Sequence, residues 1–382
     1  MIKIIPYTKH TVDNKDISAV VNVLKNYPLT QGIFTNKLEQ EFCKYTNSKY
    51  SIAVNSCTSA LFLAYQALDL KKNDVLWTSP ITFVATSNAA LMNEAKVDFV
   101  DINLQTFNMD LEKLEKKLIF AKKNKVLPKI ISIVHLGGLS VEMQKIYILK
   151  KKYGFKIVED ACHAIGASYL NNKVGSCKFS DVTVFSLHAA KSVTCGEGGV
   201  VCLNSKKLYE KIKLARSHGI KKNTKTISTG RQVSLGYNYR ITDFQSALAV
   251  SQIKKIDKFR NKKKKIFELY KKKLSKFFIF QGEDSSFNNI HGLHICIMLI
   301  KKGDSKKLID FLKKKKIIAI KHYKPIFTQP YYSKLIKNKS KEYFPNTYEY
   351  FKKTITIPMY PDLGKKECNY IVASILKFFN QK

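Results

Sequence analysis

The first half of the chain alternates short apolar runs with amphipathic or polar segments. Runs that are apolar at nearly every position are typical of strands buried on both faces, as in parallel sheets covered by helices. The candidate strands lie at 74–79, 97–102, 129–135, 155–159, 182–187 and 199–203. Amphipathic patterns indicate helices at 13–26 and 35–45, and a further helix at 58–68 follows the strand-like sequence SIAVN. Together they predict an α/β fold with a mostly parallel central sheet and helices on both faces.

The second part of the chain has a different pattern. Apolar residues recur at helical spacing from 242 to 277, with Thr242 or Asp243 as the N-cap, which predicts one long helix. Strand-like and helical segments are mixed after it. We therefore expect a large domain over 1–250 and a smaller C-terminal α+β domain over 251–382 that includes the long helix.

Two of the candidate strands end in residues that can do chemistry. GFKIVED ends at Asp160, and VTVFSLH leads to Lys191 three residues later. The carboxyl ends of parallel strands face one site, so these two residues are expected on opposite sides of one ligand. Pyridoxal 5′-phosphate (PLP) needs a lysine that forms a Schiff base and a carboxylate that keeps the ring nitrogen protonated. The pair predicts PLP, although an aspartate at a strand end is often only a helix cap.

Small polar residues stand at the N-terminus of the helix predicted at 58–68. Free N–H groups and the helix dipole at Cys57, Thr58 and Ser59 favour a phosphate, although capping alone also favours threonine and serine there. His163, three residues after Asp160, is expected either to pack against the cofactor or to be a structural histidine.

Several short motifs are spread along the chain in a fixed order. They are Leu29-Thr30-Gln31-Gly32, Asn55-Ser56-Cys57-Thr58-Ser59-Ala60-Leu61, Thr82-Phe83-Val84-Ala85-Thr86, the Asp160 and Lys191 segments, Arg216-Ser217-His218-Gly219, Gly236-Tyr237-Asn238-Tyr239-Arg240 and His322-Tyr323-Lys324-Pro325. In order and spacing the chain resembles the DegT/DnrJ/EryC1/StrS family of sugar-nucleotide aminotransferases from near residue 5 to near residue 365. The resemblance implies a fold-type I PLP-dependent transferase with a seven-stranded sheet. It also implies a homodimer with active sites at the subunit interface.

The same resemblance assigns cofactor roles. It implies that the phosphate is bound at 57–59, by Ser186 and by Asn238 of the partner subunit, and that Phe83 stacks on the cofactor ring. From the residues alone, Phe83 could equally be an ordinary core phenylalanine. Lys191 would hold the cofactor and then move the proton during catalysis. Cys57 stands where relatives often carry glycine or alanine.

Lys191 also separates two related reactions. Related sugar 3-dehydratases carry histidine at this position, so a lysine favours transamination. The resemblance is strongest to members that act in pseudaminic acid synthesis, which use L-glutamate to aminate C4 of a UDP-linked 4-keto-6-deoxy-N-acetylhexosamine. It implies substrate contacts from Tyr7, Tyr27, Pro28, Leu29, Thr30, His322, Tyr323, Lys324 and Pro325. Alternative substrates are a UDP-4-keto-pentose, suggested by segments 186–191 and 193–199, and a dTDP-4-keto-hexose.

The formal net charge of +38 raises nucleic acid as a partner. However, the chain has 63 lysines spread along its length and only four arginines, although arginine is the better phosphate ligand. We expect no specific nucleic-acid binding. A regulatory or nucleic-acid-binding protein on a PLP-transferase scaffold remains the non-enzymatic alternative, but such a protein would have no need of Asp160 and Lys191.

The eight cysteines form no CxxC pair and no zinc-like spacing with histidine, so we expect reduced thiols and no metal site. No apolar run approaches the ~18 residues needed to span a bilayer. The N-terminal sequence also lacks the features of a signal peptide. We expect a cytoplasmic protein with no membrane contact.

Overall fold

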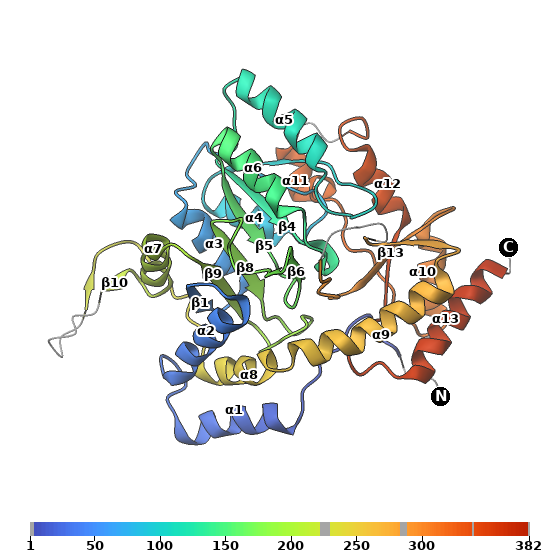
Figure 1. Cartoon of the computed structure of the whole chain (residues 1–382), viewed down its shortest axis with the longest axis horizontal. Coiled ribbons are helices and arrows are strands. Elements are labelled where there is room, and N and C mark those ends of the chain that lie inside the picture. Colours follow the sequence, from blue (N-terminus) through green and yellow to red (C-terminus); the bar gives the residue numbers. More distant parts are fainter. Residues whose placement is uncertain (1–3, 222–229, 283–288, 338–339, 381–382) are drawn as a thin grey trace.

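The computed structural model describes residues 4–221, 230–282, 289–337 and 340–380. In this part of the chain, seven strands form the central sheet (Figure 1). Their order is β1 (Tyr50–Val54), β9 (Gly199–Leu203), β8 (Val182–Ser186), β5 (Lys156–Asp160), β4 (Ile130–Val134), β2 (Val75–Thr78) and β3 (Lys96–Phe99). Strand β9 runs antiparallel to β1 and β8, and the other pairs are parallel. The predicted mostly parallel sheet is confirmed.

Helices cover both faces of this sheet because neighbouring strand residues point to opposite sides. Val182 and Val184 pack on one side, beneath α3 (Cys57–Ala67), α4 (Ala85–Met92) and α7 (Lys206–Arg216). Phe185 packs on the other side with α2 (Ile33–Thr46) and α8 (Asp243–Ile253). On that second side, α5 (Leu111–Lys123) and α6 (Met143–Tyr153) cover the part of the sheet formed by β2, β4 and β5. The predicted helices at 35–45 and 58–68 are α2 and α3.

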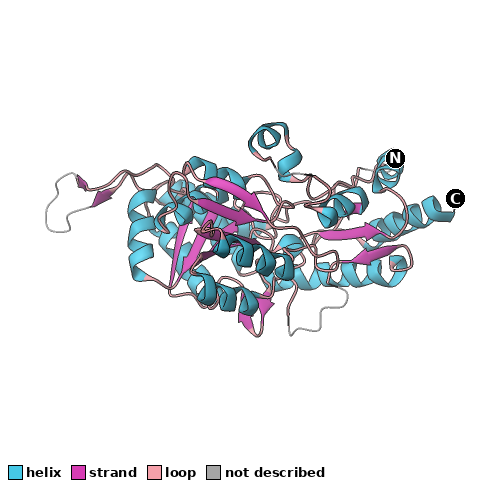
Figure 2. Cartoon of the chain, turned by 90° about the horizontal axis from the view of Figure 1, so that it is seen from above, coloured by secondary structure: helices cyan, strands magenta, loops and turns pink. Residues whose placement is uncertain are grey.

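The C-terminal part forms a second, smaller sheet (Figure 2). Antiparallel strands β12 (Phe278–Phe280), β13 (Cys296–Ile300) and β14 (Thr354–Ile357) pack with α9 (Ile256–Leu274), α10 (Ser305–Lys314) and α13 (Lys365–Asn380). Ile5 joins this core, whereas Phe327 packs against the central sheet. An N-terminal residue thus packs in the C-terminal unit, and a residue after 250 packs on the central sheet. The domain boundary at residue 250 therefore stays a prediction.

Smaller elements complete the fold. They are β6 (Ser168–Tyr169), β7 (Asn172–Lys173), β10 (Ile220–Lys221), β11 (Arg231–Gln232), the 3₁₀ turns Leu136–Gly138 and Ile326–Thr328, α11 (Pro330–Leu335) and α12 (Pro345–Lys353). The β10 and β11 strands pair beyond α7, at the left of Figure 1. None of the described helices combines the length and apolar character that a membrane span requires.

The predicted long helix at 242–277 is wrong in one respect, because two helices, α8 and α9, occupy this segment. At the break, the N–H of Lys255 donates to the carbonyl of Gln252 at 2.9 Å in a tight turn. The Lys255 ammonium contacts Asp13 at 2.6 Å and Asp16 at 2.8 Å, and these belong to the cap and first turn of α1 (Asn14–Asn26). These long-range ion pairs accompany a break that the local apolar spacing does not reveal.

Helix α8 also fixes the start of α2. Thr242 is the N-cap of α8, as one of the two predicted alternatives had it. The buried carboxylate of Asp243 accepts hydrogen bonds from the N–H groups of Gly32 at 2.6 Å, Phe34 at 2.8 Å and Thr35 at 3.1 Å. It thereby supplies the cap that Gly32, without a side chain, cannot give to α2.

Candidate functional site

A cavity of about 390 Å³ lies where β5 and β8 end and α3 begins. Of the residues predicted to bind the cofactor, its wall contains Cys57, Thr58, Phe83, Asp160, His163, Ser186 and Lys191. Of those predicted to bind the substrate, it contains Tyr7, His322 and Tyr323. The strand-end geometry thus brings Asp160 and Lys191 to one cavity, as expected.

Asp160 is a buried carboxylate held by two hydrogen bonds. The Thr86 hydroxyl donates to its Oδ2 at 2.7 Å, and the backbone N–H of Cys162 donates to its Oδ1 at 3.2 Å. A charge-assisted pair of this kind fixes the carboxylate in one orientation, ready to accept a further N–H from a ligand. Thr86 was not predicted as a site residue, although it belongs to the 82–86 motif.

A turn after β8 presents Lys191. The N–H of Lys191 donates to the carbonyl of His188 at 2.9 Å, and the N–H of Ala190 donates to His188 Nδ1 at 3.1 Å. The Ser186 hydroxyl accepts from the N–H of His188 at 3.3 Å, which leaves its own hydrogen free to donate.

The N-terminus of α3 offers donors on the cavity wall. Ser56 caps the helix by accepting from the N–H of Ser59 at 3.1 Å. In the described part of the chain, the N–H groups of Cys57 and Thr58 and the Thr58 hydroxyl have no acceptor. The Ser59 hydroxyl instead donates to Asn55 at 2.7 Å, and Ser59 does not line the cavity. Its predicted cofactor contact stays a prediction.

Phe83 supplies an uncovered aromatic ring. Its side chain is 59% exposed although it is apolar, and it lies on the cavity wall with its ring centroid 6.1 Å from that of Tyr323. It is therefore not an ordinary core phenylalanine within one chain, and it can cover a flat ligand.

His163 has a defined role in the wall. Its Nδ1 accepts from the N–H of Gly137 at 3.2 Å, so a neutral ring carries its hydrogen on Nε2, which lies 3.0 Å from the Tyr323 hydroxyl. Burial, with the nearby Lys191 charge and His322, lowers the pKa of His163 well below its usual range. The ring lies against that of His294, with centroids 4.3 Å apart and ring planes tilted by 37°. No sequence motif indicated this contact between distant segments.

His322 and Tyr7 form the adjoining part of the wall. His322 Nδ1 lies 2.9 Å from the Thr356 hydroxyl, and its ring is 5.4 Å from that of Tyr7. Burial and the nearby Lys191 charge lower the pKa of His322 to about 3. The cavity side of this segment is therefore lined by neutral polar groups.

The other predicted residues do not line the cavity of their own chain. Residues 27–30 lie before α2, where the Leu29 carbonyl accepts from the N–H of Asp243 at 2.8 Å. Asn238 is exposed and pairs with Ser217, Lys324 is exposed, and Pro325 is buried outside the wall. The roles of Tyr27, Pro28, Leu29, Thr30, Asn238, Lys324 and Pro325 stay predictions.

The residues present fit PLP. Its phosphate matches the free donors at Cys57 and Thr58, its ring matches the uncovered face of Phe83, and its ring nitrogen matches the fixed carboxylate of Asp160. Lys191 shares the cavity with all three.

Comparison with known proteins agrees with this geometry. Residues 10–376 match the DegT/DnrJ/EryC1/StrS aminotransferase family. The chain is 37% identical over 370 residues to the UDP-4-amino-4,6-dideoxy-N-acetyl-β-L-altrosamine transaminase of Campylobacter jejuni, covering 96% of this chain and 95% of the relative. It is 33% identical to the transaminase of that name from Helicobacter pylori, covering 98% and 97% of the two chains.

A solved structure extends the likeness to three dimensions. Helicobacter pylori PseC, an aminotransferase involved in the biosynthesis of pseudaminic acid, superposes with a TM-score of 0.92 at 31% identity. The match covers 100% of both chains. The expected fold-type I transferase architecture is therefore confirmed.

The three buried histidines on or beside the cavity make stability depend on pH. His163, His294 and His322 all have pKa values lowered mainly by burial, so the folded chain keeps them neutral below pH 6.5, whereas the unfolded chain protonates them. The free energy of unfolding should fall by roughly 1 kcal/mol for each such histidine between pH 7.5 and pH 5.5. Urea titrations at the two pH values measure this difference, to which His291, also buried with a pKa lowered to about 3, contributes as well. The variant His294→Asn should remove the share of one histidine. Equal stability at both pH values would contradict it.

Proposed function

The chain belongs to the DegT/DnrJ/EryC1/StrS aminotransferase family, and we propose that it transfers the amino group of L-glutamate to C4 of a UDP-linked 4-keto-6-deoxy-N-acetylhexosamine. It is a PLP-dependent sugar-nucleotide aminotransferase. The observation that carries the proposal is the meeting of Asp160 and Lys191 in one cavity, beside the free donors of α3.

PLP, when bound, supplies an electron sink that lets an amino group leave one substrate and join another. The Asp160 carboxylate, oriented by Thr86, keeps the ring nitrogen protonated. The N–H groups of Cys57 and Thr58 and the free hydrogen of Ser186 bind the phosphate. Lys191 would hold the cofactor through its side-chain amine, and the same amine would move the proton of the amino donor's α-carbon.

Tyr323 is the polar group we assign to the substrate side. Because its oxygen accepts from His163 Nε2, its own hydrogen is free to be donated into the cavity. A sugar ring is uncharged, so discrimination between sugars depends on a few such groups that a wrong epimer would leave unpaired. The activities named for the Campylobacter and Helicobacter relatives support a 4-keto-6-deoxy-N-acetylhexosamine as the substrate.

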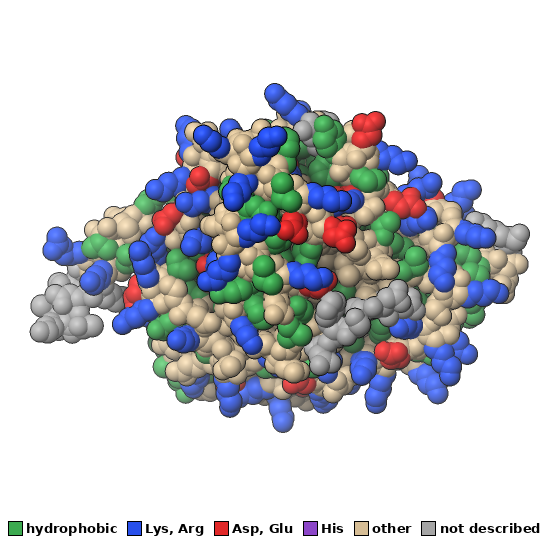
Figure 3. Space-filling view, turned by 45° about the horizontal axis from the view of Figure 1, so that its top comes forward, with side chains coloured by type: hydrophobic (Ala, Val, Ile, Leu, Met, Phe, Trp, Pro, Cys, Tyr) green, Lys and Arg blue, Asp and Glu red, His purple; other side chains and the backbone are tan. Residues whose placement is uncertain are grey.

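We also propose a cytoplasmic homodimer that binds no specific nucleic acid. All eight cysteines are free, as suits a reducing compartment. Figure 3 shows lysine and arginine side chains spread over the visible face with acidic side chains among them, instead of gathered into one basic stripe. The exposed position of Asn238 suits a residue that reaches the partner's site.

The substrate proposal predicts a selective effect of Tyr323→Phe. Loss of one hydrogen bond should lower kcat/KM for the keto sugar by roughly 10- to 100-fold. The glutamate half-reaction, followed by the absorbance change as the cofactor gains the amino group, should change little. Tyr331→Phe, at an exposed tyrosine outside the cavity, is the matched control.

The same assay should include UDP-4-keto-pentose and dTDP-4-keto-hexose. A clear preference for either would overturn the substrate and leave the aminotransferase activity standing. Equal loss in both half-reactions would instead assign Tyr323 to cofactor support.

The dimer proposal predicts complementation. Lys191→Ala and Asn238→Ala chains are each expected to be inactive, but a mixed dimer has one site with both native residues, so mixing should restore part of the activity. Light scattering measures the dimer, and labelled chains verify that subunits exchange. No recovery in exchanged mixtures would contradict a shared site.

A further inference from the structure

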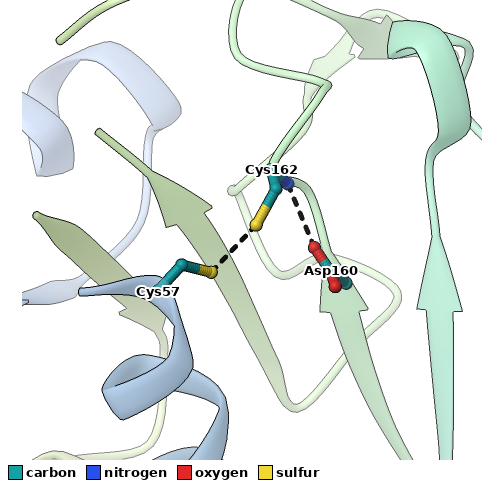
Figure 4. A group of neighbouring side chains, drawn as sticks. All are labelled: Cys57, Asp160 and Cys162. Carbon is teal, nitrogen blue, oxygen red and sulfur yellow. Dashed lines mark hydrogen bonds between the residues drawn. The ribbon is translucent and has the colours of Figure 1, made fainter. Parts of the chain in front are cut away.

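Two thiols meet in the wall of the cofactor cavity (Figure 4). Cys57 is the first residue of α3, and Cys162 follows Asp160 by two positions. Their side chains point toward each other, with the two Sγ atoms 2.8 Å apart. The proposed transamination uses neither thiol.

We propose that Cys57 and Cys162 are a modification site, at which a hydroperoxide that enters the cavity converts the two thiols to a reversible disulfide. The effect of the disulfide on PLP affinity rests on the proposed cofactor position, whereas formation of the disulfide does not.

The backbone around both residues is already fixed near the required position. A disulfide bond is about 2.05 Å long, so the two sulfurs need to approach by less than about 1 Å. The Ser56 cap holds the start of α3, and the N–H of Cys162 is bonded to Asp160. By contrast, Cys177 and Cys195 each direct Sγ to a backbone carbonyl, at 3.1 Å and 3.2 Å, and not to another sulfur.

The two cysteines have different chemical environments. The N-terminus of α3 favours negative charge, so Cys57 is suited to attack the peroxide. The hydrogen bond with Cys57, burial and the Asp160 charge raise the pKa of Cys162, which therefore stays protonated until it resolves the intermediate.

The reaction balances in two steps. The Cys57 sulfur takes one oxygen of hydrogen peroxide to become a sulfenic acid, and the other oxygen leaves as water. The Cys162 sulfur then bonds to the Cys57 sulfur and displaces the hydroxyl as a second water. The thiols lose two electrons and two protons in all, and the peroxide is reduced to two molecules of water.

A metal ion is the competing occupant, because Asp160 and both thiols gather ligand atoms within 4.8 Å of one another. Two thiolates on one zinc ion, with bonds of about 2.3 Å at tetrahedral angles, lie roughly 3.7 Å apart. The observed 2.8 Å is shorter, and both Asp160 oxygens already accept hydrogen bonds. Disulfide formation is therefore favoured over metal binding.

Oxidation should be linked to cofactor binding. The cross-link would tie the phosphate-binding start of α3 to the segment that orients Asp160, the two groups between which the cofactor is held. Bound PLP should therefore disfavour the disulfide, and by reciprocity the disulfide should weaken PLP binding by the same factor, about tenfold.

The test treats the full-length protein, with and without PLP, with hydrogen peroxide and maps the alkylated peptides by mass spectrometry. A peptide pair joined through Cys57 and Cys162 should appear, should form less in the PLP-bound protein and should vanish with dithiothreitol. Cys57→Ala, which makes the side chain smaller at the cavity wall, and Cys162→Ala should each abolish it. Cys43→Ser, at a partly exposed thiol outside the cavity wall, should leave it unchanged.

Equilibrium dialysis then measures the PLP affinity of the native chain and of the Cys162→Ala variant, each before and after the same treatment. Weakened binding that dithiothreitol restores, in the native chain only, is the expected result. Absence of the joined peptides in protein that remains folded by circular dichroism would overturn the proposal. The proposal would also be overturned if a chelator reversed the loss of PLP binding, or if peroxide weakened PLP binding equally in the Cys162→Ala variant.

Discussion

Asp160 puts a carboxylate inside the protein at the end of β5, and the function of the cavity depends on how that charge is stabilised. A buried charge is costly unless it is hydrogen-bonded or paired. The Thr86 hydroxyl and the Cys162 N–H satisfy one position on each oxygen. In the proposed function, Asp160 would hold the protonated ring nitrogen of PLP, and that opposite charge would offset the cost of burying the carboxylate.

The C-terminal unit contributes to the same site. The Lys263 amine on α9 is buried and donates to the Ser192 hydroxyl at 2.7 Å, next to Lys191 in the chain. Burial and the Arg260 charge lower the pKa of Lys263 to about 7. Tyr323, from the segment between β13 and β14, reaches His163 of the large unit. Residues in and beside the cavity wall are therefore held by contacts that cross between the two units.

The sequence was most informative where burial makes local pattern strong. Strand β8 is buried at every position and strand β5 at all but its first, and the carboxyl ends of these two strands locate Asp160 and Lys191 without any knowledge of packing. It was uninformative where contacts join distant segments. The break before α9 coincides with ion pairs from Lys255 to α1, and His294 meets His163 only in the folded chain. Residues 27–30 and Asn238 lie outside the cavity of one chain, so their predicted roles stay predictions.

The most direct test of the account is to find which lysine binds the cofactor. The protein is incubated with PLP, reduced with borohydride, digested and mapped, with Lys191→Arg as the matched control. We expect the phosphopyridoxyl group on Lys191 alone among the 63 lysines, and no stoichiometric label in the variant. Stoichiometric labelling of another residue, such as Lys263, would contradict the assignment of Lys191 and Asp160 as the residues that hold the cofactor from opposite sides. A protein that stays unlabelled and colourless would contradict it as well.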